Sequence, residues 1–184
     1  MPKKESLRKK YYTLRKKKYF EIKTGFFNPL LRLINQIKKK KCINLSSYYP
    51  SSFEVNTLKI FETNMKKKIK IFLPVLRGKN AMSFYQWNYH EVLKVNKFGM
   101  LEPFVQSSYI VPDVILVPLL SYDRNKNRLG YGKGFYDRYL KKYLKKYKNI
   151  LTIGIAFSFQ KHHTLPVTNN DVKLNYILTE KGIF

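Results

Sequence analysis

Apolar residues recur at helical spacing in four parts of the chain. They predict a very basic amphipathic helix over residues 3–23, a helix that begins at Asn28-Pro29, a third with Leu58, Phe61 and Met65 on one side, and a fourth that begins at Phe135. The fourth helix has the clearest pattern, because aromatic residues and leucines fill one side from Phe135 to Tyr147 and lysines fill the other.

Short apolar runs between these segments predict strands at residues 42–46, 69–76, 81–87, 114–117, 151–157 and 175–179. The unbroken run from Val114 to Val117 is typical of a central parallel strand that is covered on both faces. Alternation in residues 81–87 places that strand on the exposed side of the sheet, and residues 96–103 are expected to form a loop with a bend at Gly99. The alternation of strands and helices predicts one domain over residues 1–184. Its expected fold is a three-layer α/β/α, Rossmann-like arrangement with a largely parallel sheet, against whose core the basic helix packs.

Composition adds one strong signal to this pattern, which is charge. Hydrophobic residues make up 44% of the 184 residues, as in globular proteins, but the net charge is +26. Such a charge is typical of nucleic-acid-binding proteins. Lys, Asn, Ile, Tyr and Phe are abundant together, however, while Ala81 and Ala156 are the only alanines. We therefore interpret the charge as compositional bias and expect no nucleic-acid partner.

Several classes of protein are excluded by what the sequence lacks. No apolar run is long enough for a transmembrane helix, and no apolar segment of a secretory signal follows the basic N-terminus. Cys42 is the single cysteine, so a zinc site built on thiolates is excluded. We expect a cytoplasmic monomer without membrane contact.

The most informative stretch runs from Arg128 to Asp137 and reads Arg-Leu-Gly-Tyr-Gly-Lys-Gly-Phe-Tyr-Asp. Its three alternating glycines leave the backbone bare beside two cations, between a predicted buried strand and a predicted helix. Backbone N–H groups of such a loop and of the following helix N-terminus can face a phosphate. The dinucleotide fingerprint is excluded by Phe135, and the Walker loop is excluded because Gly134 follows Lys133. The alternative is a strand-to-helix turn in which glycine meets only a steric need.

Several stretches together resemble one known family. They are residues 4–8 (Lys-Glu-Ser-Leu-Arg), 54–57 (Glu-Val-Asn-Thr), 98–103 (Phe-Gly-Met-Leu-Glu-Pro), 117–123, 128–140 and 154–157, with the neighbourhood of Asp171. On these stretches the chain resembles the 5-formyltetrahydrofolate cyclo-ligases, also called 5,10-methenyltetrahydrofolate synthetases. The resemblance implies a ligase in which ATP phosphorylates the formyl oxygen of 5-formyltetrahydrofolate. Nitrogen-10 then attacks the activated carbon, and phosphate leaves as the 5,10-methenyl ring closes; Mg²⁺ is required.

The resemblance implies that ATP is bound by the N-terminal motif and by the glycine block. The ATP-binding candidates are Lys4, Glu5, Ser6, Leu7, Arg8, Arg128, Leu129, Gly130, Tyr131, Gly132, Lys133, Gly134, Phe135 and Tyr136. By the resemblance, Lys4 and Arg8 reach the phosphates, and their i, i+4 spacing puts them on one helix face, as binding of one anion requires. The alternative is an ordinary solvated basic helix. Arg128 and Lys133 are the catalytic candidates, because they would stabilise charge on the transferring phosphoryl group.

The resemblance also implies a folate site and a metal site. Glu54 would bind the pterin, whose N–H donors suit a carboxylate. Tyr49, Trp87 and Phe135 are candidate apolar walls, although each could equally pack in the core. The segment that would line the cleft between the two substrates is Tyr131, Gly132, Lys133, Gly134 and Phe135. Asp137 and Asp171 are the candidate Mg²⁺ ligands, although an Asp in the first turn of a helix is also favoured by the helix dipole.

The chain departs from the family's pattern in two places. Family members often have glycine between Asp123 and Arg128, where Asn125 or Asn127 is expected to take the left-handed position. Near the C-terminus they often have His-Asp and a second Asp, where this chain has Asn170-Asp171 and Asn175, which removes a possible metal or base contact. Two alternatives stay open: a basic RNA- or DNA-binding module without catalysis, and a catalytically degraded family member that still binds folate.

Overall fold

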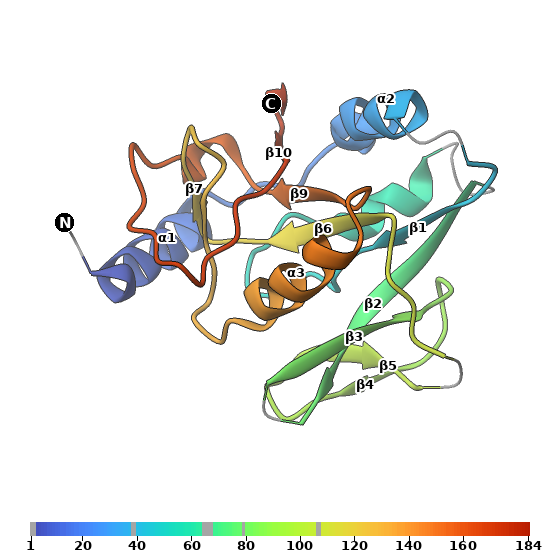
Figure 1. Ribbon diagram of the computed structural model, residues 1–184. Coiled ribbons are helices and arrows are strands. Elements are labelled where there is room, and N and C mark those ends of the chain that lie inside the picture. The colour runs from blue at the N-terminus through green and yellow to red at the C-terminus, as the bar shows by residue number, and fades with distance from the viewer. Residues whose placement is uncertain (1–2, 38–39, 64–67, 79, 106–107) are drawn as a thin grey trace.

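The computed structural model describes residues 3–37, 40–63, 68–78, 80–105 and 108–184 (Figure 1). A seven-stranded sheet runs through it in the order β11-β10-β9-β6-β1-β2-β3. The strands are β1 (Ile43–Ser46), β2 (Ile69–Arg77), β3 (Ala81–Gln86), β6 (Val114–Pro118), β9 (Leu151–Ile155), β10 (Tyr176–Thr179) and β11 (Gly182–Ile183). The five inner strands pair in parallel, whereas β3 and β11 pair antiparallel at the two edges. The predicted largely parallel sheet is confirmed.

Strand β6 lies at the centre of the sheet, as its unbroken apolar run predicts. It pairs with β1, where Leu45 lies opposite Val114, and with β9 along its whole length. Val114 and Leu116 pack into the core on one face, and Ile115 and Val117 pack into the core on the other. A strand whose successive side chains are all buried needs cover on both faces, and the helices supply it.

The helices make two outer layers and an end cap. Helix α3 (Phe135–Lys146) covers one face, and α2 (Asn28–Ile37) with the 3-10 helices η1 (Thr24–Phe27) and η2 (Thr57–Glu62) covers the other (Figure 1). Helix α1 (Lys4–Lys18) lies at the end of the sheet toward which β6 points, and η4 (Ser158–Gln160) contacts it (Figure 1). The predicted three-layer arrangement is confirmed. Within the described ranges, the helices are too short or too polar to cross a membrane.

Helix α1 ends at Lys18, so the predicted helix over residues 3–23 is wrong in its last part. The chain continues in an extended conformation after Tyr19. The Phe20 ring then packs on Phe157 with 4.7 Å between centroids, and Ile22 is buried in the core. These apolar side chains reach the core because the chain leaves the helix before them.

Two further predictions of local structure need correction. The third predicted helix is a short 3-10 helix, Thr57–Glu62, and Met65 lies outside the described residues. The predicted loop over residues 96–103 is part of a hairpin, in which β4 (Leu93–Val95) pairs antiparallel with β5 (Leu101–Pro103). The bend at Gly99 is confirmed, with φ at 75°. Strands of three residues are too short to show the alternation of apolar and polar residues by which a strand is predicted.

The strand over residues 81–87 was expected on the exposed side of the sheet, and β3 is indeed an edge strand. Its alternation has a specific cause, because every second side chain faces α3. Met82 and Phe84 are buried on that face, and the Phe84 ring meets Tyr139 of α3 edge to face, with 4.9 Å between centroids.

A small hairpin separates the central strand from the glycine block. Strand β7 (Ser121–Tyr122) pairs antiparallel with β8 (Arg128–Leu129). The turn between them is organised by the buried Asp123 carboxylate, which accepts hydrogen bonds from the backbone N–H groups of Asn125 and Asn127 at 2.9 and 3.0 Å. The left-handed residue is Lys126, with φ at 64°, so the prediction that Asn125 or Asn127 takes that position is wrong. Because the N–H groups of Asn125 and Asn127 both donate to Asp123, the left-handed conformation falls on Lys126, which lies between them.

Candidate active site

The glycine block lies at the end of the sheet to which the inner parallel strands point (Figure 1). From β8 the chain passes through residues 130–134 and enters α3 at Phe135. Gly132 and Gly134 have φ values of 96° and 69°, a left-handed conformation that glycine adopts without steric cost. The carboxyl ends of parallel strands are the usual place for a ligand site in open α/β sheets.

Each glycine of the block has an arginine side chain next to it. The pairs are Gly130 with Arg128, Gly132 with Arg8, and Gly134 with Arg138. A Cβ atom added to the glycine would come within 2.9, 3.2 and 2.7 Å, respectively, of a guanidinium atom in these pairs. The missing side chains therefore let three guanidinium groups approach the loop backbone. This arrangement concentrates positive charge over bare peptide groups, as binding of phosphate requires.

Lys4 and Arg8 reach the site from one face of α1. Lys4 Nζ forms an ion pair with Asp171, and Arg8 Nε donates a hydrogen bond to the Gly130 carbonyl at 3.0 Å. These contacts span more than a hundred residues of sequence. Both side chains are therefore held against the fold by specific contacts.

The other N-terminal ATP candidates have different positions. Leu7 packs in a small buried cluster that holds α1 against the β7–β8 hairpin. The cluster consists of Leu7, Tyr11, Leu120, Leu129 and Leu165. Ser6 donates a hydrogen bond to the Lys3 carbonyl at 2.8 Å, and Glu5 is exposed. The side chains of Leu7 and Leu129 thus fix the helix on the loop.

Arg128 and Asp137 form a largely buried ion pair, with Nη2 2.9 Å from Oδ1 and only 4% of the arginine side chain exposed. The Arg128 guanidinium also lies 5.8 Å from the centre of the Tyr136 ring. Its Nε atom and the Tyr136 hydroxyl are buried and have no hydrogen-bond partner in the part of the chain that the structure describes. Buried donors without an acceptor cost free energy, so a ligand that supplies acceptors here would be favoured.

Asp137 and Asp171 lie next to each other, because Asp137 Oδ1 accepts a hydrogen bond at 3.1 Å from the N–H of Val172. One oxygen of each carboxylate is held by a cation, Asp137 Oδ1 by Arg128 and Asp171 Oδ2 by Lys4. Among the described residues, no donor contacts the second oxygen of either carboxylate. Two free carboxylate oxygens fit Mg²⁺, which takes one or two carboxylates together with waters and phosphate oxygens. The described ranges contain no group of three His, Cys, Asp or Glu residues that could hold a metal by itself.

The electrostatics of Asp171 favour its ionised form. Partial burial acts to raise the pKa of Asp171, but hydrogen bonds from Lys4 and from Thr168 outweigh burial and lower the pKa. The Thr168 N–H and hydroxyl donate to Asp171 Oδ2 at 2.6 and 2.9 Å. The carboxylate is therefore charged and fixed in place at neutral pH.

Glu54 sits in a buried position, with 8% of the residue exposed. Ser51 N–H donates to Oε2 at 3.0 Å, and the Tyr131 hydroxyl donates to Oε1. The two residues before Glu54, Ser52 and Phe53, have φ values of 48° and 64°, and such a conformation costs about 1 kcal/mol or more for each residue that is not glycine. Strained backbone of this kind concentrates at functional sites. Tyr131 joins this strained turn to the glycine block.

Arg15 is a further residue of this cluster that the sequence pattern did not single out. It is 1% exposed and donates hydrogen bonds to the carbonyls of Leu119 at 3.3 Å and Ser52 at 2.8 Å. Its guanidinium lies 5.5 Å from the centre of the Tyr131 ring. Burial raises the pKa of Glu54, and the charge of Arg15 acts against this rise.

Lys133 and Phe135 meet the tip of the β4–β5 hairpin. The Lys133 ammonium lies 5.6 Å from the centre of the Phe98 ring, whose centroid is 5.9 Å from that of Phe135. Lys133 is exposed, and no acidic residue in the described ranges forms an ion pair with it. Its ammonium group is accessible to a ligand over the loop.

The other two predicted apolar walls lie together in a separate aromatic cluster. The Trp87 ring meets Tyr49 and Phe61 edge to face, with 6.3 and 5.6 Å between centroids. Trp87 is buried, and its Nε1 donates to the Glu91 carbonyl at 3.0 Å. The described ring contacts do not join this cluster to Phe135. The burial of Trp87 is what the core-packing alternative expects.

A model of the 5-formyltetrahydrofolate cyclo-ligase family matches residues 1–180 of the chain. The chain belongs to this family. The cyclo-ligase from Haemophilus influenzae is 30% identical over 151 residues, which cover 79% of this chain and 80% of that protein. The probable cyclo-ligase from Schizosaccharomyces pombe is 32% identical over 160 residues, which cover 78% of each. The family that the sequence motifs indicated is confirmed.

Solved structures of 5,10-methenyltetrahydrofolate synthetases share the fold of this cyclo-ligase family member. The structure from Aquifex aeolicus has a TM-score of 0.72 and 29% identity, and the match covers 98% of this chain and 91% of that chain. The structure from Mycoplasma pneumoniae has a TM-score of 0.69 and 25% identity, with 97% and 99% covered. The predicted fold class is confirmed.

Asn175 is one of the two positions near the C-terminus where the chain departs from the family's pattern, and the structure gives it a structural partner. Its Oδ1 accepts hydrogen bonds from the N–H and the hydroxyl of Thr152, both at 2.8 Å. The contact links the start of β9 to the segment that leads into β10. Asn170 accepts a hydrogen bond from Lys141 at 3.3 Å.

Two arginines of the candidate site, Arg15 and Arg138, were not predicted from the sequence. Arg138 donates hydrogen bonds to the carbonyls of Asn80 and Lys133, both at 2.9 Å, and so ties the β2–β3 turn to the glycine loop. It directly follows Asp137 and lies inside the resembling stretch 128–140, which was the available signal. For Arg15 the signal was its spacing from Lys4 and Arg8, since positions i, i+4 and i+11 share one helix face.

Proposed function

We propose that this member of the cyclo-ligase family converts 5-formyltetrahydrofolate to 5,10-methenyltetrahydrofolate with ATP, and that the glycine block is the place of phosphoryl transfer. One observation carries the proposal: cations from distant segments converge on one bare loop. Arg8 of α1 covers Gly132 and binds the Gly130 carbonyl, while Arg128 is held beside the loop by Asp137. Preorganised positive charge of this kind suits a transferring phosphoryl group.

The chemistry supplies its own nucleophiles. The formyl oxygen attacks the γ-phosphorus of ATP, and the bond from that phosphorus to the β,γ-bridging oxygen breaks, which releases ADP. Nitrogen-10 then attacks the formyl carbon and loses its proton, and phosphate leaves with the former formyl oxygen. The protein has to align two substrates and neutralise phosphate charge, without a nucleophile of its own.

The residues divide this work by position. Lys133 and Arg128 would stabilise charge on the γ-phosphoryl group, because both belong to the block that ends at α3. Lys4 and Arg8 would bind the other phosphates from the side of α1. Backbone N–H groups of residues 130–134 would complete the phosphate contacts.

Asp137 and Asp171 would hold Mg²⁺ through the carboxylate oxygens that no described donor contacts. The ion, when bound, neutralises charge on the phosphate oxygens. Before the ion binds, Arg128 and Lys4 hold the opposite oxygens of the two carboxylates in place.

The folate would extend from Glu54 across the loop. Glu54 would accept hydrogen bonds from the pterin N–H groups, in place of or beside the bond from the Tyr131 hydroxyl. Phe135 would contact the flat rings, and Phe98 lies against it on the hairpin tip. Tyr49, which is partly exposed, would add a second apolar wall, and the buried Trp87 would support it from the core.

The test is formation of the methenyl product, followed by its absorbance, with 5-formyltetrahydrofolate, ATP and Mg²⁺. A folded protein that shows no ATP-dependent rise would refute the function. Lys133→Ala should lower kcat by roughly 100- to 1,000-fold, the usual effect of removing one stabilising group. Lys97→Ala is a matched control, because the ammonium groups of Lys97 and Lys133 lie 5.3 and 5.6 Å from the same Phe98 ring. Equal activity of the two variants would refute the role of Lys133.

A further inference from the structure

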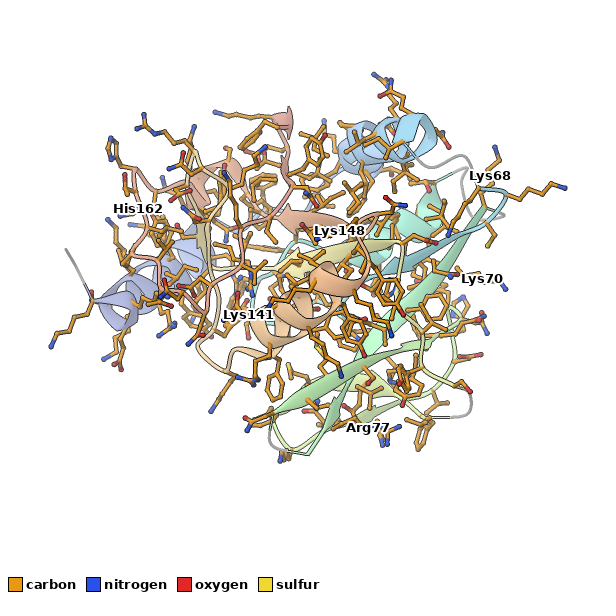
Figure 2. All side chains as sticks on the ribbon, viewed as in Figure 1. Lys68, Lys70, Arg77, Lys141, Lys148 and His162 are labelled. Carbon is orange, nitrogen blue, oxygen red and sulfur yellow. The ribbon has the colours of Figure 1, made fainter. Side chains whose placement is uncertain are left out.

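Arg15 of α1 is a cation in the interior of the protein. It is 1% exposed, whereas Lys68, Lys70 and Arg77 are exposed at the periphery of the molecule (Figure 2). In the described ranges no carboxylate forms an ion pair with Arg15, and its buried Nε atom has no hydrogen-bond partner. Burial of a cation without an ion-pair partner costs free energy. We therefore expect Arg15 to have a role other than the stability of its helix.

Arg15 holds the turn that carries Glu54. Its Nη2 atom donates to the Ser52 carbonyl at 2.8 Å, and its Nη1 atom donates at 3.3 Å to the carbonyl of Leu119, which directly follows β6. Ser52 and Phe53 are the two left-handed residues of the turn. Left-handed residues other than glycine persist only where neighbouring contacts fix them. Arg15 thus ties the strained turn to the end of the central strand.

Arg15 also lies beside the residue that binds Glu54 directly. Its guanidinium group is 5.5 Å from the centre of the Tyr131 ring, and the Tyr131 hydroxyl donates to Oε1 of Glu54. Burial raises the pKa of Glu54. Of the influences that favour the ionised carboxylate, the charge of Arg15 is the largest, ahead of the hydrogen bonds from Tyr131 and Ser51. Since Arg15 and Glu54 are both buried, water and salt screen their attraction only weakly.

Three tyrosines also lie near Glu54. Tyr48 follows β1, Tyr131 belongs to the glycine block, and Tyr136 lies in the first turn of α3. Burial and the charge of Glu54 raise the pKa of each tyrosine, so all three stay neutral over the range in which a carboxylate titrates. Arg15 is therefore the charged neighbour that acts most strongly on Glu54.

We propose that Arg15 is a positioning residue of the folate site, which fixes the turn before Glu54 and supplies the counter-charge of the Glu54 carboxylate. This inference rests on the proposed function for the contact between Glu54 and the pterin. Arg15 has almost no exposed surface for a substrate to touch, so it acts on binding through Glu54. A neutral residue at this position should leave less of the ionised carboxylate that the pterin N–H groups need.

The direct test measures the pKa of Glu54 by carbon NMR of protein with labelled glutamate side chains, in which Glu54→Gln identifies the Glu54 signal. Arg15→Met is neutral and of similar length, and it should raise the pKa of Glu54 by roughly one unit, the lower end of the effect of one nearby opposite charge. Arg15→Gln should act in the same way. Its amide keeps a donor for one of the two carbonyls, so this variant replaces Arg15→Met if the latter does not fold. An unchanged pKa in the folded neutral variants would overturn the proposal.

Two controls separate the charge of Arg15 from other effects of substitution. Arg15→Lys keeps the charge and should leave the pKa of Glu54 near its wild-type value. Lys16→Met removes a charge at the next position of α1, but Lys16 is exposed, so its charge is screened and the pKa of Glu54 should not change. An equal shift in Lys16→Met and Arg15→Met would show an effect of net charge alone and overturn the proposal.

Binding of the folate gives a second readout. At pH values below the pKa of Glu54, KM for 5-formyltetrahydrofolate should be up to roughly tenfold higher in the neutral variants than in Arg15→Lys, because one pKa unit corresponds to a tenfold loss of the ionised form. The difference should disappear at pH values at which Glu54 is ionised in every variant, and KM for ATP should not change. A difference of the same size at every pH would show a structural effect alone and overturn the proposal.

The NMR titration needs no catalysis, so this proposal and the catalytic one fail separately. A shifted pKa of Glu54 in a folded protein that forms no methenyl product would refute the catalytic proposal and support the role of Arg15 toward Glu54. A protein that forms the methenyl product, but in which the pKa of Glu54 does not respond to the charge at position 15, would overturn this inference alone.

Discussion

Replacement of Gly134 by alanine tests whether the loop glycines exist to admit arginine side chains. Gly134 caps the N-terminus of α3 with φ at 69°. A Cβ atom there would lie 2.7 Å from Nη1 of Arg138. The same guanidinium donates to the carbonyls of Asn80 and Lys133 at 2.9 Å each. Alanine would therefore strain the backbone and push Arg138 away from both acceptors.

The magnitude follows from two separable terms. A left-handed alanine costs about 1–2 kcal/mol relative to glycine. Each of the two hydrogen bonds of Arg138 contributes about 0.5–1 kcal/mol, since the residue is exposed. Gly134→Ala should thus lower the free energy of unfolding by roughly 2–4 kcal/mol, which corresponds to a fall in Tm of roughly 5–15 °C for a chain of this size.

Gly99→Ala provides the control for backbone strain alone. Gly99 has φ at 75°, close to that of Gly134, but a Cβ atom at Gly99 would meet nothing within 4 Å. Its replacement should cost only the strain term of about 1–2 kcal/mol. Urea and thermal unfolding of both variants measure the difference. A Gly134→Ala protein no less stable than Gly99→Ala would refute the steric role of Arg138.

A double-mutant cycle with Arg138→Ala isolates the interaction. Once the guanidinium is absent, Gly134→Ala should cost only the strain term, so the two substitutions should show a coupling of about 1–2 kcal/mol. Additive effects of the two changes would show that the close approach in the structure carries no free energy. Activity provides a second readout, because Arg138 fixes the Lys133 carbonyl, and a displaced loop should lower kcat/KM.

Three further changes address the charged groups of the site. Asp137→Asn should lower kcat roughly 100-fold in a folded protein, because the asparagine amide lacks the negative charge opposite Arg128. Steady-state kinetics over a magnesium titration check this. Wild-type rates at every magnesium concentration would refute the role of Asp137. Burial raises the pKa of Glu54, so KM for the folate should fall as pH rises through that raised pKa and the carboxylate forms. Glu54→Gln should raise KM and make it independent of pH over the same range. A pH-dependent KM in the variant would contradict the role of Glu54. Because the pKa of Asp171 is lowered in the folded protein, its contribution to stability should be complete above the unfolded value of about 3.9 and lost as pH falls through the folded value. The Tm difference between wild type and Asp171→Asn should accordingly be constant from about pH 5 to 7 and vanish at lower pH; a constant difference at all pH values would be inconsistent with this.

The sequence predicts those parts of the fold that local pattern decides. The central strand is readable because Val114 to Val117 are buried on both faces, and α3 is readable because its apolar side faces β3. The glycine block is readable because its chemistry is confined to ten consecutive residues. In all three cases the pattern can be read because the residues that define it lie close together in the sequence or because a whole face of the element is buried. That residues 1–184 form one domain stays a prediction.

The remaining features depend on distant partners. The end of α1 is decided by Phe157, on which Phe20 packs. The β4–β5 hairpin has strands of three residues, too short for a period. The spacing of Arg15 places it on the helix face of Lys4 and Arg8, but its burial depends on carbonyl acceptors more than thirty residues away. Local sequence does not show tertiary contacts of this kind.

Contacts among α1, β8, α3 and the neighbouring loops explain how a site with so many cations stays folded before its ligands bind. A buried charge without a partner is strongly destabilising, and the buried and partly buried cations of the site have partners: Lys4 has Asp171, Arg128 has Asp137, and Arg8 and Arg15 have backbone carbonyls. Phosphates that enter would draw on Lys4 and Arg128, while a magnesium ion that accompanies them would draw on the two carboxylates. Partners would then be exchanged without leaving any of these charges uncompensated. On the proposed function, these ion pairs are the form that the phosphate and metal sites take before the ligands bind, which would account for the position of both aspartates beside cations.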